Sequence, residues 1–207
     1  MTDTLFPLGF VFTGPPSAGK TTTLEAIARL RPDWQTMSES ARKVFEEAKA
    51  KGDPNITVKN RAFSDIVFLR QREREKPGYV DRDRICIFDR GLLDPLGYKS
   101  MDGETIPEAT DEQLTNRYNL VFLFDPLPEQ VQDGMRDDMA QTAQIQEALR
   151  AQYLAHGHTV IPVPFGTVEE RATFVMDMIE QAAGLKPKTP RFGAYMMHFS
   201  PASKDFV

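Results

Sequence analysis

Residues 14–21 read Gly-Pro-Pro-Ser-Ala-Gly-Lys-Thr, which matches the G-x-x-x-x-G-K-[ST] pattern of phosphate-binding loops. The apolar run at residues 8–13 before it predicts a buried strand, and residues 19–30 after it predict a helix that stops at Pro32. In that context the backbone N–H groups of the loop turn inward and form a nest for an anion at the helix N-terminus. The stretch predicts a nucleotide-phosphate site, and the alternative is a chance match in a loop of small residues.

Within this loop, Lys20 is expected to reach the β- and γ-phosphates of a nucleotide, and the Thr21 hydroxyl to ligate Mg²⁺. The two glycines allow the backbone to approach the phosphates closely. The residues predicted to bind the nucleotide are Gly14, Pro15, Pro16, Ser17, Ala18, Gly19, Lys20, Thr21 and Thr22.

Strand and helix patterns alternate along the rest of the chain. We expect strands at residues 8–13, 34–37, 84–88, 120–124 and 157–164. We expect helices at residues 19–30, 41–51, 59–75, 129–155 with an interruption near Gly134, and 168–183. A helix or turn should begin within 92–98, and residues 101–113 should form a polar loop with a short helix near its end. This alternation predicts an α/β fold with a parallel sheet covered on both faces.

The composition excludes several classes of protein. The chain has 207 residues, of which 41% are hydrophobic, and a net charge of -5, so we expect one folded domain with no broad attraction to nucleic acid or anionic membrane. One cysteine and three histidines exclude an intramolecular disulfide and a cysteine-only zinc site. The N-terminal stretch has no basic region, and no apolar run approaches the ~18 residues of a membrane span. We therefore expect a cytoplasmic enzyme or binding module.

A phosphate-binding loop of this kind needs an acid for Mg²⁺ at the end of a neighbouring strand. Asp89 and Asp125 each follow an expected strand. We favour Asp89, because Arg90 follows it and places a guanidinium at the edge of the sheet where ligands bind in such folds. Capping or loop closure would account for Asp125, and an ordinary surface ion pair is the alternative for Arg90.

Glu39 follows the second expected strand, so its carboxylate should lie at the same edge. There it could act as the base that takes a proton from an acceptor hydroxyl. Arg42, three residues later, shares its helical face and is a second candidate for the acceptor site. On spacing alone, a capping Glu with a solvent-facing Arg is the better interpretation.

Several segments together resemble one family of small P-loop proteins. Beside the loop, they are Ser-Glu-Ser-Ala-Arg at 38–42, Phe-Asp-Arg-Gly-Leu-Leu-Asp at 88–94, Asp-Gly-Met-Arg at 133–136, Val-Pro at 163–164 and Glu-Glu-Arg at 169–171. The family is the AAA-domain group related to the ribosylnicotinamide kinase domain of bacterial NAD-biosynthesis regulators. The chain resembles deoxynucleoside and thymidylate kinases more distantly, and the resemblance covers about residues 8–182.

The resemblance implies a three-layer P-loop NTPase fold whose five-stranded parallel sheet has the order 2-3-1-4-5. It implies a kinase-like domain over residues 1–184, with a lid at about 126–145, and an extension over 185–207. It also implies roles for matching residues. Glu39 would be the acceptor-side carboxylate, Asp89 and Arg90 would act at Mg²⁺ and the phosphates, Arg136 would close on the γ-phosphate, and residues 165–167 would lie near the adenine.

Two positions depart from the kinase pattern. Deoxynucleoside kinases usually carry Ser where Gly91 stands, and their lids tend to carry several arginines, whereas residues 126–140 here contain Arg136 alone. These departures bear on nucleoside specificity rather than on phosphoryl transfer.

The segment 61–76 carries five basic residues and interspersed acids. A solvated face is the favoured interpretation. The alternatives are that Arg61 or Phe63 contacts the acceptor, or that the basic residues hold the end of a polynucleotide. We interpret His156 and His158 as turn residues, Cys86 as a core residue, and the aromatic segment 186–207 as packing on the domain or a second subunit, with an active-site flap as the alternative.

Three functions remain open from the sequence. The first is an ATP- and Mg²⁺-dependent kinase that acts on a small, nucleoside-like acceptor. The second is a nucleotide-hydrolysing switch, and the third is a polynucleotide-end kinase, which the acidic composition disfavours. The chain lacks the N-K-x-D run that would indicate GTP, and a homodimer is left open.

Overall fold

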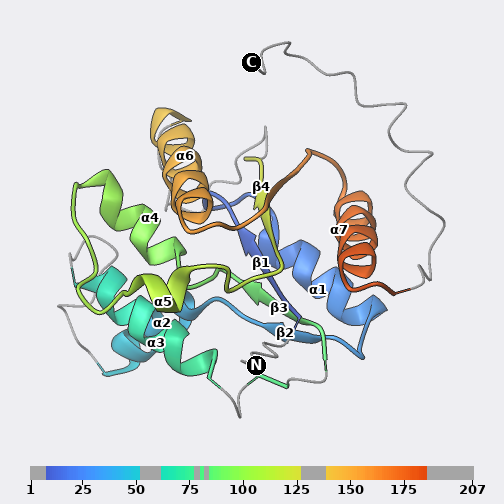
Figure 1. Ribbon diagram of the computed structural model, residues 1–207, viewed down its shortest axis with the longest axis horizontal. Coiled ribbons are helices and arrows are strands. Elements are labelled where there is room, and N and C mark those ends of the chain that lie inside the picture. The colour runs from blue at the N-terminus through green and yellow to red at the C-terminus, as the bar shows by residue number, and fades with distance from the viewer. Residues whose placement is uncertain (1–7, 52–61, 77–79, 82–83, 127–138, 186–207) are drawn as a thin grey trace.

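The computed structural model describes residues 8–51, 62–76, 80–81, 84–126 and 139–185. Its five strands form one sheet in which every neighbouring pair is parallel. The strands are β1 (Gly9–Thr13), β2 (Gln35–Met37), β3 (Cys86–Asp89), β4 (Leu120–Phe124) and β5 (Val160–Val163). Their order across the sheet is β2-β3-β1-β4-β5 (Figure 1), which confirms the expected α/β fold and the expected order 2-3-1-4-5.

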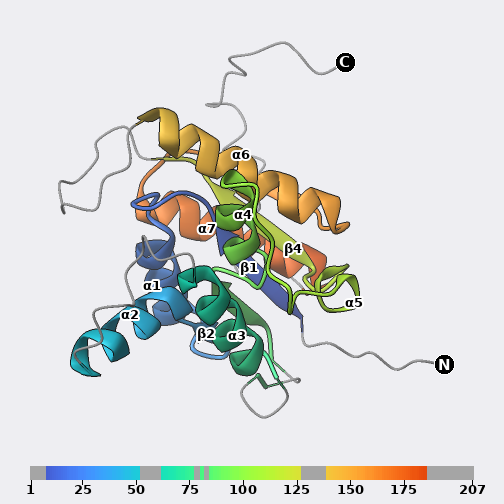
Figure 2. The same ribbon diagram turned by 90° about the vertical axis from the view of Figure 1, so that its left-hand side faces the viewer.

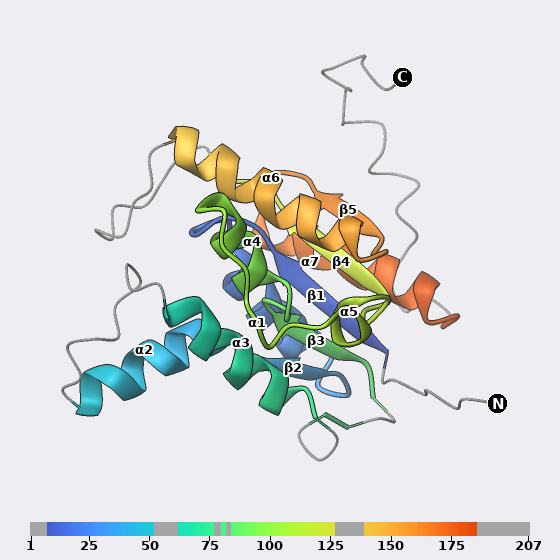
Figure 3. The same cartoon turned by 60° about the vertical axis from the view of Figure 1, so that its left-hand side comes forward.

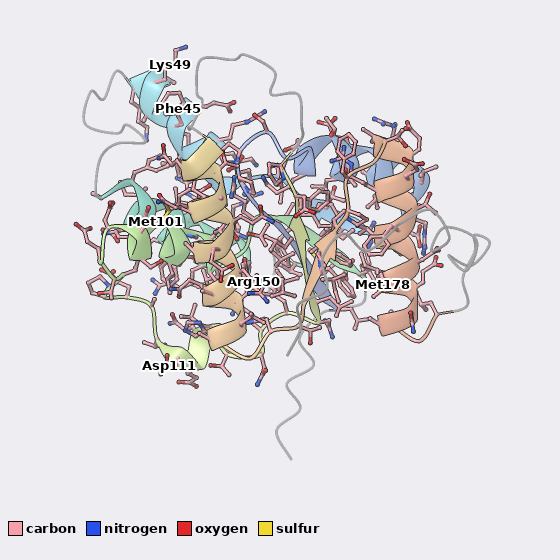
Figure 4. All side chains as sticks on the ribbon, turned by 90° about the horizontal axis from the view of Figure 1, so that it is seen from above. Phe45, Lys49, Met101, Asp111, Arg150 and Met178 are labelled. Carbon is pink, nitrogen blue, oxygen red and sulfur yellow. The ribbon has the colours of Figure 1, made fainter. Side chains whose placement is uncertain are left out.

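Helices cover both faces of this sheet. They are α1 (Lys20–Leu30), α2 (Ser40–Lys51), α3 (Phe63–Arg74), α4 (Asp94–Met101), α5 (Asp111–Leu114), α6 (Met139–Ala155) and α7 (Val168–Ala182). Helices α1 and α7 lie side by side on one face, and α6 lies against α4 on the other (Figures 1 and 2). Helix α3 contacts both α2 and α4 (Figure 3). In Figure 4 the label Arg150 marks α6 and the label Met178 marks α7, and the strands lie between these two helices.

Strand side chains alternate between the two faces, because successive residues of a strand point in opposite directions. On the α1/α7 face the strands contribute mostly phenylalanine and isoleucine to the core. These residues are Phe10, Phe12, Ile87, Phe122 and Phe124. On the α4/α6 face they contribute Val11, Cys86, Phe88 and Val121, which pack beside Tyr118 and Tyr153. The core on the α1/α7 face of the sheet is therefore apolar, whereas the core on the α4/α6 face contains tyrosine hydroxyls.

Some element boundaries differ slightly from the expected ones. Strand β3 begins at Cys86 rather than at residue 84, because its pairing with β1 and β2 begins there. Just before it, the Arg84 guanidinium donates to the carbonyl oxygens of Pro32, Asp33 and Trp34. Helix α4 continues the expected start at 92–98, and the short helix expected near residue 113 is α5. The C-terminal part of the helix expected at 129–155 is α6, whereas residues 127–138, and with them most of the expected lid, lie outside the described residues.

Within the described part of the chain, no helix is long and apolar enough to cross a membrane. Cys86 is a fully buried core residue, as expected. Burial raises the pKa of its thiol to about 12, so it is a small apolar side chain rather than a reactive one.

Candidate active site

The phosphate-binding loop lies between the end of β1 and the start of α1, at the carboxyl edge of the sheet. Its two glycines adopt positive φ angles, +135° at Gly14 and +78° at Gly19, which other residues rarely adopt. The Lys20 ammonium donates hydrogen bonds to the carbonyl oxygens of Gly14 and Pro15, at 3.0 and 2.7 Å. Burial, reinforced by the charge of Arg90, lowers the pKa of Lys20 to about 7. An anion in the loop would favour the charged form of this lysine.

Thr21 lies beside Asp89, as a magnesium site requires. The Thr21 hydroxyl donates to Asp89 Oδ2 at 2.6 Å, while Asp89 Oδ1 is buried and accepts no hydrogen bond from any described residue. Burial raises the pKa of this carboxyl. An orphaned buried oxygen next to a hydroxyl fits Mg²⁺, which binds hard oxygen ligands and is usually held by one or two protein groups plus phosphates and water. No group of three or more His, Cys, Asp or Glu among the described residues could hold a metal by itself.

The other candidate acid, Asp125, has a different environment. Its Oδ1 accepts a hydrogen bond from Gln146 Nε2 of α6 at 2.8 Å. Asp89, by contrast, contacts the hydroxyl of the loop itself. Asp125 is thus linked to α6, and the preference for Asp89 as the acid near Mg²⁺ stays a prediction.

Arg90 connects the loop to the predicted acceptor side. Its Nε donates to Glu39 Oε1 at 2.6 Å, and its Nη1 donates to the Gly14 carbonyl at 3.2 Å and to Asp94 Oδ1 at 3.0 Å. The backbone of Arg90 has a φ of +70°, a strained conformation that is typical of functional sites. Although burial raises the pKa of Glu39, the charges of Arg90 and Lys20 outweigh it and the pKa lies below its usual value. Glu39 is therefore an ionised carboxylate that faces the phosphate loop through Arg90.

Asp94 is the buried centre of this arrangement. It is 1% exposed and accepts hydrogen bonds from the Thr13 hydroxyl at 2.9 Å, the Gly91 amide at 3.1 Å and the Tyr153 hydroxyl, besides that from Arg90. These donors come from β1, from the segment after β3 and from α6. Asp94 thereby fixes the position of Arg90 relative to the loop.

The glycine at position 91 is required by two tyrosines. A Cβ at Gly91 would lie 2.6 Å from the Tyr153 hydroxyl, 3.0 Å from Val11 Cγ2 and 3.1 Å from the Tyr118 hydroxyl. The departure from Ser at this position therefore has a physical reason, because the hydroxyls fill the space that a larger side chain would need.

Helix α3 supports the same segment from the other side. Gln71 Nε2 donates to the Arg90 carbonyl at 3.2 Å and to Glu75 Oε1 at 2.6 Å, and its Oε1 accepts from the Ser40 hydroxyl. Glu75 also accepts a hydrogen bond from the Tyr118 hydroxyl. Hydrogen bonds through Gln71 and Glu75 thus connect Ser40, the residue after Glu39, with Arg90 and Tyr118.

The basic side chains of α3 are mostly engaged within the fold. Both Nη atoms of Arg70 contact the Glu47 carboxylate, at 2.9 and 2.8 Å. Arg74 donates to the Ser38 carbonyl at 2.6 Å. The Arg70 and Glu47 side chains remain 40% and 43% exposed, so this ion pair lies on a face that is still solvated, although Arg70 and Arg74 already have partners within the fold.

The other predicted site residues are partly or fully exposed, or lie outside the described residues. Arg42 is exposed on α2, and its charge is among those that lower the pKa of Glu39. Phe63 is partly buried at the first residue of α3. Phe165, in the loop expected near the adenine, is 57% exposed. Arg61 and Arg136, like the segment 186–207, lie outside the described residues.

Three residues in the interior were not assigned these roles from the sequence. Asp94 lies within the 88–94 segment, but its partners are spread over 140 residues of chain. Arg171, in the first turn of α7, donates to the Ala18 carbonyl of the phosphate loop at 2.9 Å across 153 residues. His158 is buried rather than only a turn residue, since its Nε2 accepts from the Arg117 amide at 3.1 Å. No spacing rule in the sequence signals contacts between such distant positions.

Comparison with known proteins agrees with this geometry. A family model described as an AAA domain matches residues 9–171. No curated protein matches the chain by sequence.

Solved structures share the fold at low identity. The NadR protein in complex with NAD and AMP-PNP is 18% identical with a TM-score of 0.61, over 90% of this chain and 52% of that one, so this chain spans about half the length of NadR. Thymidylate kinase from Ehrlichia chaffeensis is 15% identical with a TM-score of 0.58, and deoxyadenosine kinase from M. mycoides is 12% identical with a TM-score of 0.57. Each of these two matches covers 84% of this chain and 98% of the other.

Proposed function

Because the chain belongs to the AAA-domain family, we propose that it is an ATP- and Mg²⁺-dependent phosphotransferase that moves the γ-phosphate to a hydroxyl or phosphate group of a small, nucleoside-like acceptor. One observation carries the proposal: the ionised Glu39 and the Thr21–Asp89 pair lie at one edge of the sheet, and both are close enough to Lys20 and Arg90 for their charges to interact. The first supplies a carboxylate for an acceptor, and the second a site for a metal and phosphates. The kinases among the solved neighbours support the same general activity.

On the nucleotide side, the loop amides would hold the phosphate chain and Lys20 would leave the carbonyl oxygens of Gly14 and Pro15 to contact it. Thr21 and Asp89 would hold Mg²⁺, which when bound neutralises negative charge on the phosphates. The orphaned Oδ1 of Asp89 is the atom best placed for this contact.

On the acceptor side, Glu39 would orient or deprotonate the attacking hydroxyl. Its ion pair with Arg90 keeps the carboxylate ionised and fixes its direction. Arg90 would add positive charge beside the transferring group, and Arg136 would close on it as the resemblance implies, with Arg42, Arg61 and Phe63 as candidate acceptor contacts.

The structure favours the two alternative functions less than the phosphotransferase. A nucleotide-hydrolysing switch needs no carboxylate for an organic acceptor, so Glu39 favours the phosphotransferase. A polynucleotide-end kinase needs free basic side chains, and the engagement of Arg70 and Arg74 argues against it.

The experiment that tests the proposal measures ADP release from Mg-ATP, with GTP in parallel, in the presence of nucleosides, nucleotides, sugars, vitamins and oligonucleotides. We expect one class of small acceptor to stimulate release. Lys20→Ala and Asp89→Asn should abolish most of it, whereas Asp125→Asn, the matched acid at the end of the next strand, should retain it. If no acceptor stimulates release and hydrolysis depends on a protein partner, the proposal is wrong.

Glu39 is tested separately from the nucleotide side. Glu39→Gln should lower turnover by about 10²–10⁴-fold, the usual contribution of a positioned base, with little change in the KM for ATP. Glu46→Gln, on the exposed side of α2, is the control. An equal loss in both variants would remove the assigned role.

A further inference from the structure

Two buried arginines join the same pair of helices at opposite ends. At the C-terminal end of α1, Arg31 contacts Glu180 of α7 and Asp33, and its guanidinium stacks 4.1 Å from the centre of the Trp34 ring. At the N-terminal end, Arg171 of α7 contacts the residues that precede α1. Helices α1 and α7, which lie side by side (Figure 1), therefore run in the same direction, and these contacts place one arginine at each end of the pair.

The two arginines differ in their counter-charges. Arg31 lies between two carboxylates, which raise its pKa together with its hydrogen bond to Asp33. Arg171 is 5% exposed and has no carboxylate within ion-pair distance among the described residues. Its Nη1 and Nε donate only to the carbonyl oxygens of Ala18, at 2.9 Å, and Thr167, at 3.4 Å.

The carboxylate next to Arg171 in the sequence does not balance its charge. Glu170, the preceding residue, closes the capping box of α7 through Thr167. On the sheet side the guanidinium faces the ring of Phe124, whose centre is 6.0 Å away. Burial alone lowers the pKa of Arg171, with no charged neighbour among the causes. A buried charge without a counter-ion is costly, since desolvation is not offset by attraction.

The position of this charge is specific. The guanidinium packs directly on Gly19, where a Cβ would lie 2.7 Å from Nη2. Gly19 immediately precedes the N-terminus of α1, where backbone N–H groups and the helix dipole attract an anion. The charge of Arg171 thus adds to that of Lys20 on the same loop.

We propose that Arg171 is a positioning residue of the nucleotide site, whose buried charge is balanced when the phosphate chain of a nucleoside di- or triphosphate occupies the loop. The proposal rests on the nucleotide site of the proposed function but requires no phosphoryl transfer. It means that α7 contributes to phosphate affinity through the back of the loop, although no residue of α7 belongs to the sequence motif.

The test compares Arg171→Met with Arg31→Met, two substitutions that remove a buried arginine from the same helix pair. The dissociation constant of Mg-ADP and that of inorganic triphosphate are measured by calorimetry, and the melting temperature is measured without nucleotide. We expect Arg171→Met to weaken both ligands at least about tenfold, as removal of one side of a desolvated charge pair does, without lowering the melting temperature. Arg31→Met should lower the melting temperature and leave both dissociation constants unchanged, because it removes the buried ion pair between Arg31 and Glu180 that joins α1 to α7.

Arg171→Lys retains the charge but cannot donate in the same fork, so it should retain more affinity than Arg171→Met. A weakening below tenfold in Arg171→Met overturns the proposal, as does a fall in melting temperature as large as that of Arg31→Met, which a purely structural brace predicts. Mg-ADP binding is measured without an acceptor, so a failure of phosphoryl transfer leaves this result standing. Unchanged binding in Arg171→Met would conversely leave the phosphotransferase proposal intact.

Discussion

The two faces of the sheet are built differently although the same strands form both. On the α1/α7 face, phenylalanine rings pack on one another and on aliphatic side chains of the helices, with Phe12 and Phe122 in edge-to-face contact at 5.8 Å. On the α4/α6 face, Tyr118, Tyr153, Asp94 and Glu75 exchange buried hydrogen bonds. The first face derives its stability from the burial of apolar area, and this effect does not depend on the direction in which the side chains meet. The second face depends on geometry, and its hydrogen bonds end at Arg90.

This difference indicates that the two faces of the sheet have different roles. The apolar face holds the domain together, whereas the polar face sets the position of Arg90 and, through it, Glu39. A substitution in the apolar core of the α1/α7 face should therefore change stability, and one among the hydrogen-bonded side chains of the α4/α6 face should change turnover as well.

Asp94→Ala should have the largest effect, because it removes four hydrogen bonds and leaves the Arg90 guanidinium with Glu39 as its one carboxylate partner among the described residues. We expect a loss of about 3–5 kcal/mol of unfolding free energy, as when one partner of a buried ion pair is removed. Turnover should also fall by about 100-fold, the cost of a misplaced reacting group. Denaturant titration and initial rates well below the melting temperature measure the two effects, and native turnover in the folded variant would break the comparison.

Phe122→Ala should match that loss of stability without the loss of turnover. The side chain is fully buried on the α1/α7 face, and such truncations cost about 3–5 kcal/mol. The kcat of the folded fraction should stay close to native, and the same two measurements apply. A fall in kcat as large as that of Asp94→Ala would mean that both faces position the site.

Gly91→Ala should have an intermediate effect. The new methyl group would push against the Tyr153 and Tyr118 hydroxyls and against Val11, at a cost of about 1–3 kcal/mol typical of overpacking. Because Tyr153 contacts Asp94, kcat should fall with stability. Gly97→Ala, which crowds Leu149 between α4 and α6 instead, is the control and should lower stability with a smaller change in kcat.

The smallest effect concerns pH and His158. Burial lowers the pKa of this imidazole more than its hydrogen bond to the Tyr153 carbonyl raises it, and the charge of Arg117 acts in the same direction as burial. Its Nε2 must be unprotonated to accept from the Arg117 amide. Since the folded pKa lies below the unfolded one, near 6.5, the unfolded state binds more protons in acid. The stability that His158 contributes is therefore complete above pH 6.5, and it is lost as the pH falls below that value and through the lower pKa of the folded state.

Denaturation midpoints at pH 7.5 and 5.5 measure this effect. His158→Gln should show a smaller drop between the two values than the native protein, whereas His156→Gln, in the same turn, should keep most of the native drop, because burial is the main cause that lowers the pKa of His158. An equal drop in all three would place the acid sensitivity elsewhere.

The fold was largely predictable from the sequence, and the candidate site only in part. The strands and their order follow from apolar runs and from the loop at 14–21, which are local signals. Asp89 and Glu39 were predictable because parallel strands bring their carboxyl ends to one edge. Asp94, Arg171 and Gln71 were not assigned roles, because their partners lie far along the chain and only the packed fold brings them together.

Gly91 is a second example of a feature whose cause could not be predicted from the sequence. In the sequence it is a departure from a kinase pattern, with no sign of a cause. In the structure the cause is the pair of hydroxyls of Tyr118, which lies just before β4, and Tyr153, which belongs to α6. A deviation at one position is thus explained by side chains that no local pattern connects with it.

The position of Trp34, which stacks on Arg31, determines what its fluorescence can report. Trp34 is the one tryptophan of the chain, it is 5% exposed, and it lies at the far end of α1 from the phosphate loop. An 11-residue helix separates the indole from that loop by roughly 16 Å. A nucleotide in the loop therefore does not contact the indole, and a change in emission on nucleotide binding would report a conformational change transmitted through the protein to the far end of α1.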